Sequence, residues 1–251
     1  MALTPLLLLP GLLNDARVWD PILQVIGQER IVVKGQTHVA DNVGALAAAS
    51  LARMPAGRFA VAGFSLGGYV ALEVCRQARD RIAGIALIDT SARADTAEAR
   101  LNRQRILDRL KAGSATFDQV AAELAPGLLH PAHAADEKLL ALLLDMARTV
   151  GVAGFVSQQT AAMNRADRRD VLQTLACPAL VICGREDQVT PPERSEQMAH
   201  LLKGDVELLL VPQAGHLTTL EQPEAVTEAA LRWLAKVDAS SSTRSTMGSG
   251  A

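Results

Sequence analysis

The chain has 251 residues, of which 49% are hydrophobic and 21% charged, so it can bury the core of one large α/β domain or two small ones. Its 25 Lys and Arg residues against 27 Asp and Glu residues leave a net charge of −2, and it has only four Phe, two Trp and one Tyr. This composition argues against a nucleic-acid partner, because it supplies neither excess positive charge for phosphates nor many aromatic faces for bases.

The apolar opening of the chain does not have the features of a membrane span or a signal peptide. Leu6 to Leu13 is interrupted by Pro10 and Gly11, is far shorter than about 20 residues, and has no basic residue before it. The three cysteines lie in apolar runs without metal-ligand spacing, at Cys75, Cys177 and Cys183. They are typical of reduced core residues. We therefore expect a cytoplasmic protein with no membrane association and no metal.

Six short, almost wholly apolar runs predict strands that are buried on both faces, as in a parallel sheet. They are Pro5–Leu9, Arg30–Val33, Phe59–Ala62, Gly84–Ile88, Ala179–Cys183 and Val206–Val211. Helical patterns lie between or after them, at Val18–Ile26, Val43–Met54, Leu66–Ala78, Pro192–Leu202 and Pro223–Lys236. The alternation predicts a doubly wound, mostly parallel α/β sheet of about six strands flanked by helices, with its working loops at the carboxyl ends of the strands.

One interval, residues 93–167, breaks this alternation because it contains helical patterns and no strand. The patterns cover Thr96–Lys111, Phe117–Leu124, Ala134–Val150 and Gly151–Met163. They predict a helical cap inserted after the strand that ends near Ile88. The core then comprises residues 1–92 and 168–237, and the Ser-, Thr- and Gly-rich residues 238–251 form a flexible tail.

The most specific motif is Gly63-Phe64-Ser65-Leu66-Gly67, which joins a predicted strand to a predicted helix. This is the context in which a G-x-S-x-G sequence exposes a nucleophilic serine on a sharp turn. The two glycines allow the strand and the helix to approach without a Cβ clash. A glycine-rich turn with a capping serine is the alternative for this motif alone.

Two later loops also follow predicted strands. Cys183-Gly184-Arg185-Glu186-Asp187 precedes Pro191, and Pro212-Gln213-Ala214-Gly215-His216 follows the last strand. With the serine turn, they make the chain resemble the α/β-hydrolase fold superfamily, and more narrowly its small bacterial esterase-like serine hydrolases, from about Leu6 to Ala235. The resemblance implies a catalytic triad of Ser65, Asp187 and His216, in the chain order expected for this fold.

The resemblance also implies an oxyanion hole made of backbone N–H groups. Pro10-Gly11-Leu12-Leu13 is similar to the family's His-Gly-x-x segment, with Pro10 in place of the histidine. The matching donors are the N–H groups of Leu12 and Leu66, although the Pro10 departure leaves Leu13 open as an alternative to Leu12. The residues expected to line the substrate pocket, besides these two, are Leu13, Phe64 and Leu217.

Three further features of the sequence keep more than one interpretation. Asp89 ends a predicted strand and is the reserve acid of the triad. His38 is interpreted as a solvated loop histidine rather than a substrate contact. The arginines around the first cap helix are a solvated face by default and an anion-binding rim as the alternative; they are Arg93, Arg100, Arg103, Arg105 and Arg109.

The function implied by the resemblance is serine-dependent hydrolysis of a small or medium carboxylic ester or lactone through an acyl-enzyme. It requires no cofactor, its partner is a small ester-like molecule, and the sequence leaves monomer and homodimer open. Two alternatives remain. One is other chemistry on the same triad, such as a C–C bond hydrolase, a lyase or a perhydrolase; the other is a ligand-binding receptor with little turnover.

Overall fold

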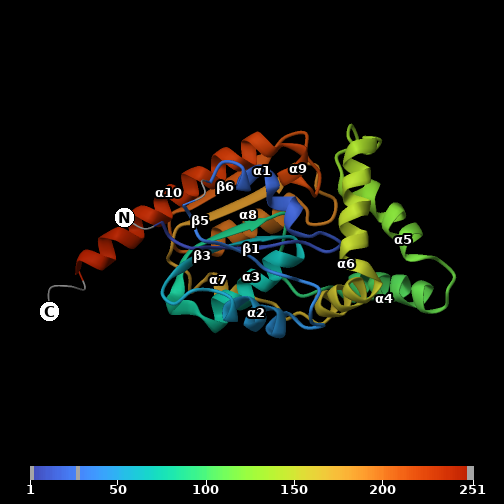
Figure 1. Cartoon of the computed structure of the whole chain (residues 1–251), viewed down its shortest axis with the longest axis horizontal. Helices are drawn as coiled ribbons and strands as arrows, with labels where there is room; N and C mark the ends of the chain where they lie inside the picture. Colours follow the sequence, from blue (N-terminus) through green and yellow to red (C-terminus); the bar gives the residue numbers. More distant parts are fainter. Residues whose placement is uncertain (1–2, 27–28, 248–251) are drawn as a thin grey trace.

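The computed structural model describes residues 3–26 and 29–247 and contains one six-stranded parallel sheet (Figure 1). The strands are β1 (Leu6–Leu9), β2 (Val32–Lys34), β3 (Phe59–Phe64), β4 (Ile82–Ile88), β5 (Ala179–Gly184) and β6 (Val206–Val211). All six predicted strands are present, with ends shifted by at most two residues. Their order is β2-β1-β3-β4-β5-β6, so the chain reverses direction across the sheet beside β1. In such sheets, ligand sites form at the carboxyl ends of the strands near the reversal.

Alternate side chains of each strand point to opposite faces of the sheet, and each face buries its own apolar core. Leu6 and Leu8 of β1 pack on one face with Trp233, whereas Leu7 and Leu9 pack on the other with Val70. The first face is covered by α1 (Asp20–Leu23), α9 (Thr218–Glu221) and α10 (Pro223–Met247), and the second by α2 (Val43–Ala52), α3 (Leu66–Gln77), α7 (Arg169–Leu172) and α8 (Pro192–Leu201). The fold is therefore doubly wound, as predicted.

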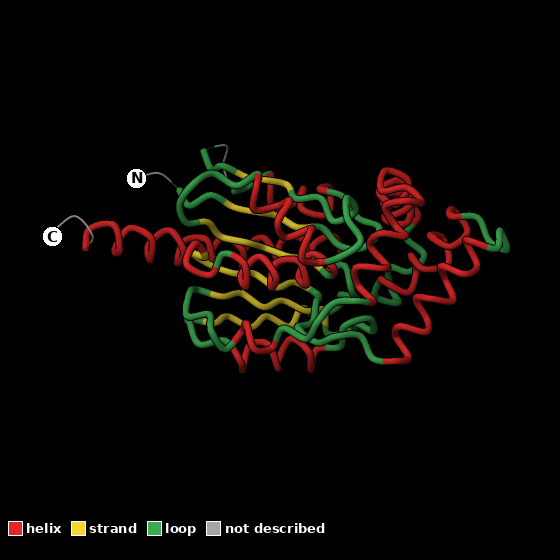
Figure 2. The backbone as a smooth tube through the Cα atoms, turned by 90° about the horizontal axis from the view of Figure 1, so that it is seen from below, coloured by secondary structure: helices red, strands yellow, loops and turns green. Residues whose placement is uncertain are grey.

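Three helices follow β4 in the chain and lie beyond the carboxyl ends of the strands (Figures 1 and 2). They are α4 (Ala97–Lys111), α5 (Phe117–Leu124) and α6 (Glu137–Met163). Gly151, with φ 71° and ψ 170°, breaks α6 at the boundary between the two helices predicted there. By length and composition α6 is apolar enough to cross a membrane, a property that buried core helices share. The break leaves two pieces, each shorter than the about 20 residues of a membrane span.

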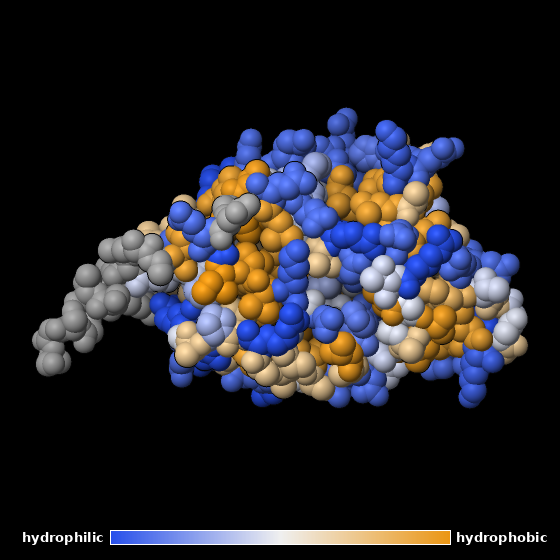
Figure 3. Space-filling model, in the orientation of Figure 1, coloured by the Kyte–Doolittle hydropathy of each residue, from blue (hydrophilic) through white to orange (hydrophobic). Residues whose placement is uncertain are grey.

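The surface of this capped end is mixed in character. On the face shown in Figure 3, apolar side chains gather in patches between charged ones over the cap helices. The large exposed apolar side chains of the cap are Leu101 in α4 and Val152 and Val156 in α6. Single exposed apolar residues of this kind are normal on folded proteins.

The prediction of a flexible tail from residue 238 is wrong for its first part, because α10 continues to Met247. Asp238 accepts a hydrogen bond from the backbone N–H of Thr4 (2.9 Å) and forms an ion pair with Arg30 (2.7 Å), whose side chain is only 5% exposed. The helix is thereby tied to the beginning of β1. Residues 248–251 of the predicted tail lie outside the described residues.

Candidate active site

Ser65 lies on the turn between β3 and α3 and has an unusual backbone conformation, with φ 51° and ψ −117°. Its N–H donates to the carbonyl of Ile88 (2.9 Å), and its own carbonyl accepts from the N–H of Gly68 (2.8 Å) and the hydroxyl of Thr90 (2.7 Å). Positive φ is costly for a residue with a side chain and persists only where neighbouring contacts fix it. These three hydrogen bonds fix the turn that carries the Ser65 hydroxyl.

The glycines on either side of Ser65 are needed for close contact between backbones. A Cβ atom on Gly67 would lie 2.0 Å from the carbonyl oxygen of Leu9, and one on Gly63 would lie 2.3 Å from the carbonyl oxygen of Gly67. Both distances are far below van der Waals contact. The strand and helix therefore meet in the way that the sequence motif predicts.

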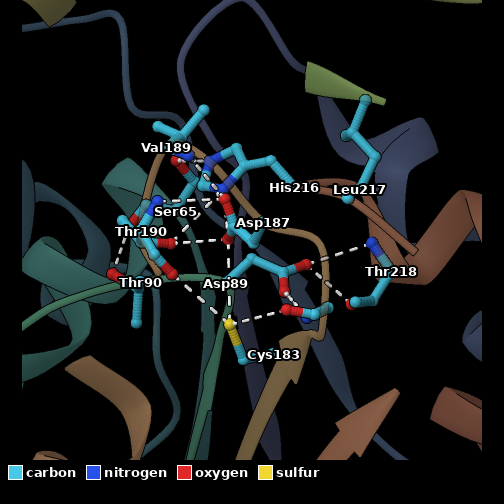
Figure 4. Close-up of polar contacts among 12 residues, drawn as sticks. Ser65, Asp89, Thr90, Cys183, Asp187, Val189, Thr190, His216, Leu217 and Thr218 are labelled. Carbon is cyan, nitrogen blue, oxygen red and sulfur yellow. Dashed lines mark hydrogen bonds and ion pairs between the residues drawn. The ribbon is translucent and has the colours of Figure 1, made fainter. Parts of the chain in front are cut away.

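The structure brings together the three side chains that the sequence singles out (Figure 4). His216 Nε2 lies 2.8 Å from Ser65 Oγ, and His216 Nδ1 lies 2.8 Å from Asp187 Oδ2. Asp187 also accepts hydrogen bonds from the N–H groups of Val189 (2.8 Å) and Thr190 (2.9 Å) and from the Thr190 hydroxyl (2.7 Å). A serine, an imidazole and a buried carboxylate thus form a continuous hydrogen-bonded chain.

The surroundings of His216 and Asp187 determine their pKa values. Burial lowers the pKa of His216, but the charge and hydrogen bond of Asp187, helped by the charges of Asp89 and Glu221, outweigh it, so this pKa lies above the ordinary 6.5. Burial raises the pKa of Asp187, but His216 and the bonds from Thr190 hold it below its usual value. These interactions favour the ionised form of Asp187.

Asp89, the reserve acid, is fully buried at the end of β4 and makes no hydrogen bond to His216. It accepts bonds from the N–H of Gly184 (3.1 Å) and from the N–H (3.1 Å) and hydroxyl (2.6 Å) of Thr218. Burial, and then the charge of Asp187, raise the pKa of Asp89 well above its usual range. Asp89 thus links the end of β5 to the loop that carries His216. Of the two carboxyl groups, Asp89 and Asp187, it is Asp187 that favours the ionised form.

Asp89, Cys183 and Asp187 are also the set of described residues whose ligand atoms lie close enough together to hold a metal ion. All three are buried, and both carboxylates already accept the hydrogen bonds given above. A metal ion would have to replace these bonds, so the donor set does not fit a resident cation.

Two backbone N–H groups are candidates for an oxyanion hole. Among the described residues, those of Leu12 and Leu66 have no hydrogen-bond partner, whereas that of Leu13 donates to Gln158 Oε1 (3.0 Å). Leu66 begins α3, where the helix dipole favours negative charge. The geometry favours Leu12 over Leu13 as the first donor.

Two polar residues that sequence reasoning missed hold these loops. Gln158 of α6, fully buried, bonds Leu13 as above, and its amide donates to the carbonyl of Gly11 (3.3 Å) and to Thr37 Oγ1 (3.1 Å). Glu221 of α9 accepts from the N–H groups on both sides of His216, those of Gly215 (2.8 Å) and Leu217 (3.3 Å). A polar residue within an apolar cap helix was the available signal for Gln158. The residue that it contacts, Leu13, is 145 positions away, so the sequence does not indicate this bond.

A cavity of about 320 Å³ opens at Ser65 and His216 beneath the cap. Its lining is mostly apolar and includes Leu12, Leu13, Leu66, Ile106, Leu124, Leu128 and Leu217. The prediction that Phe64 lines it is wrong, because Phe64 is 1% exposed and packs beneath the site, 5.6 Å from the ring of His216 and against Gly11. His38 does not line it either and packs against Gly154 of α6. Much of the pocket lining therefore comes from the cap and from residues 10–13 after β1, which we call the oxyanion loop after the role expected for it.

Comparison with known proteins identifies the class to which this fold and site belong. A family model described as alpha/beta hydrolase fold matches residues 34–223, and the chain therefore belongs to the α/β-hydrolase family. In structure it is similar to a thermophilic esterase from Thermogutta terrifontis, solved with malate bound. The identity is 31% and the TM-score 0.84, covering 94% of this chain and 90% of that one.

Curated relatives agree with this assignment. The chain is 29% identical, over 66% of its length, to a pimeloyl-[acyl-carrier protein] methyl ester esterase from Neisseria meningitidis. It is 28% identical, over 93% of its length, to the dihydrolipoyllysine-residue acetyltransferase component of the acetoin cleaving system of Pseudomonas putida. It spans 65% and 64% of the lengths of these two proteins. The family is thus a hydrolase family with esterases among the relatives of this chain.

Proposed function

We propose that this protein hydrolyses carboxylic esters with Ser65 as nucleophile. The observation that carries the proposal is the hydrogen-bonded chain from Ser65 Oγ through His216 to Asp187, with 2.8 Å at both links. An isolated serine hydroxyl is a weak nucleophile, and an adjacent imidazole that accepts its proton during attack makes it effective. The raised pKa of His216 makes the imidazole a stronger base in this step.

In the first half of the reaction, Ser65 Oγ attacks the acyl carbon and its proton moves to His216 Nε2. The free N–H groups of Leu12 and Leu66 stabilise the negative oxygen of the tetrahedral intermediate. Collapse of the intermediate breaks the bond to the alcohol oxygen, which takes the proton from His216. An acyl group is then esterified to Ser65, and the alcohol leaves.

In the second half, water takes the position of the alcohol. His216 removes a proton from the water as it attacks the acyl carbon, and returns that proton to Ser65 Oγ when the acid leaves. Asp187 keeps Nδ1 of the imidazole protonated throughout, so Nε2 faces the serine in the form that accepts a proton. Every atom of this cycle is supplied by substrate, water and the chain itself.

The cavity limits the size of the substrate. A volume of about 320 Å³ with a leucine-rich lining suits a small or medium ester with an apolar acyl or alcohol part. A small-molecule partner therefore remains our proposal. The same three side chains also serve peracid formation and C–C bond cleavage on this fold, and a substrate panel separates these reactions from ester hydrolysis.

The test is labelling and turnover by variants. Ser65→Ala should abolish labelling by a fluorophosphonate probe and lower kcat for a 4-nitrophenyl ester by at least on the order of 10³-fold. Ser114→Ala is the matched control, because this exposed hydroxyl donates to the carbonyl of Arg109 and has no other hydrogen bond within the described part of the chain. Unchanged labelling and turnover in Ser65→Ala contradict the proposal.

A further inference from the structure

A second cavity, of about 390 Å³, adjoins the apolar one and differs from it in charge. The two share Tyr69, Ala99, Arg103 and Val189 in their walls. We call this second cavity the arginine annex, because four arginines line it: Arg93, Arg103, Arg165 and Arg194. The other charged side chains in its lining are Asp95 and Asp167.

Two of the four arginines share the single carboxylate of Asp95, so this cluster keeps a net positive charge. This carboxylate binds Arg103 (2.8 Å) and Arg165 (2.5 Å). Arg165 is further held by the carbonyls of Arg93 (2.9 Å) and Ala162 (2.8 Å), and its guanidinium stacks on the ring of Tyr69 at 3.9 Å. Arg165 and Asp95 therefore form the framework of the annex.

The other two arginines form no ion pair with any described carboxylate, although the charge of Arg93, after the hydrogen bonds and charge of Arg169, lowers the pKa of Asp167. Arg93 Nε donates to Gln197 (2.7 Å), and neither Nη atom of Arg93 is bonded within the described residues. The side chain of Arg194 forms no hydrogen bond or ion pair with any described residue, although it is half-buried. Asp167 forms its ion pair with Arg169 (2.8 Å), which is not part of the annex lining. The annex thus contains two guanidinium groups ready to bind an anion.

The annex is next to the side chains of the proposed triad. Thr190, one of its lining residues, bonds Asp187 and lies 3.4 Å from His216 Nδ1 (Figure 4). Tyr69, in the wall between the two cavities, is one helical turn from Ser65 along α3. Because Tyr69 and Arg103 line both cavities, the annex adjoins the cavity that opens at Ser65.

We propose that the arginine annex binds a carboxylate of the substrate, so that the preferred substrates are esters with a free carboxylate several bonds from the scissile carbonyl. A carboxylate matches the planar, forked donors of a guanidinium, and a partly buried site strengthens the pairing. This proposal deepens the ester-hydrolase function proposed above and rests on it.

Turnover of a matched ester pair tests the proposal. The pair is 4-nitrophenyl hydrogen adipate and 4-nitrophenyl hexanoate, which have acyl chains of equal length and differ in the terminal carboxylate. Arg194→Gln and Arg93→Gln should each raise KM for the adipate ester by about tenfold and leave kcat/KM for the hexanoate ester within about twofold. Arg105→Gln, which removes the same charge from an exposed position of α4, is the control and should change neither ester.

A binding measurement separates this proposal from the function on which it rests. In the Ser65→Ala background, calorimetry should show tighter binding of monomethyl adipate than of methyl hexanoate, and Arg194→Gln should remove the difference. If the wild type cleaves no ester but this difference is found, the hydrolase proposal fails and the annex stands. If the two ligands bind equally, or if Arg105→Gln weakens binding as much as Arg194→Gln, the annex proposal is overturned.

Discussion

Gln158 offers a test of whether a residue in the cap controls the oxyanion loop. We consider Gln158→Met, because methionine keeps the length and most of the volume of glutamine while it removes the amide. The substitution breaks bonds to Leu13, Gly11 and Thr37. The bonds to Leu13 and Gly11 flank Leu12, whose N–H is the proposed oxyanion donor.

The structure sets the size of the expected effects. The buried N–H of Leu13 loses its partner, which costs about 1–3 kcal/mol, and the bond to Thr37 adds about 1 kcal/mol. The carbonyl of Gly11 still accepts a hydrogen bond from the N–H of Asn14 (3.3 Å), so losing its bond from Gln158 costs little stability. We expect the free energy of unfolding to fall by about 2–4 kcal/mol.

The catalytic effect is a separate quantity. A shift of about 1 Å in the position of a catalytic group costs on the order of 100-fold, and loss of one oxyanion donor costs about 100- to 1000-fold. Because Gln158→Met loosens the loop of Leu12 without removing the N–H, we expect kcat to fall by about tenfold to 100-fold with KM changed little. A trifluoromethyl ketone should lose affinity in parallel, since it mimics the tetrahedral intermediate.

The assay is steady-state kinetics and inhibition by this ketone, with urea unfolding measured on the same preparations. Thr160→Val is the control, because it removes one hydrogen bond within α6, to the carbonyl of Val156 (2.8 Å), and leaves the oxyanion loop untouched. If Gln158→Met loses stability but keeps its kcat and its affinity for the ketone, the cap does not position the donor, and the reasoning is refuted.

Three other predictions concern the charges and the close packing of the site. Because neutral His216 is the base and its pKa is raised, kcat/KM should fall on acidification with a midpoint above pH 6.5. Asp187→Asn removes the negative charge that raises this pKa and should move the midpoint to lower pH. A midpoint that does not move contradicts this electrostatic explanation. Asp187→Asn should also lower kcat on the order of 10³–10⁴-fold. Asp89 makes no hydrogen bond to His216, so Asp89→Asn should lower kcat by about tenfold or less. If stopped assays give the reverse order, Asp89 is the acid of the triad. Gly67→Ala should lower the free energy of unfolding in urea by about 2–4 kcal/mol, because the new Cβ atom meets the backbone of Leu9. Gly127 has open space around it, so Gly127→Ala should change this free energy by no more than about 1 kcal/mol. Equal losses of stability in the two variants would show that the contact at Gly67 is not the cause.

The sequence by itself predicted the elements whose signals are local. Buried parallel strands are apolar on both faces, so each appears as a short unbroken run, and all six were found. The turn at Ser65 also has a local signal, two glycines and a serine between a strand and a helix, although bonds to the more distant Ile88 and Thr90 fix its backbone. The break of α6 at Gly151 follows from the same kind of signal, a residue that can adopt positive φ.

Tertiary structure alone decided the features that depend on partners far away in the chain. Nothing near Asp238 indicates that Arg30 will anchor it, and so the helix there was predicted as a flexible tail. Phe64 is next to Ser65 in sequence, but the alternation of side chains along β3 turns it under the site and away from the cavity. The arginine annex combines the two ends of the cap segment with Tyr69 of α3 and with residues 189–194, and only folding decides which of its charged groups are paired. Local patterns fix backbone conformation, whereas burial and pairing of polar groups are set by contacts between distant segments.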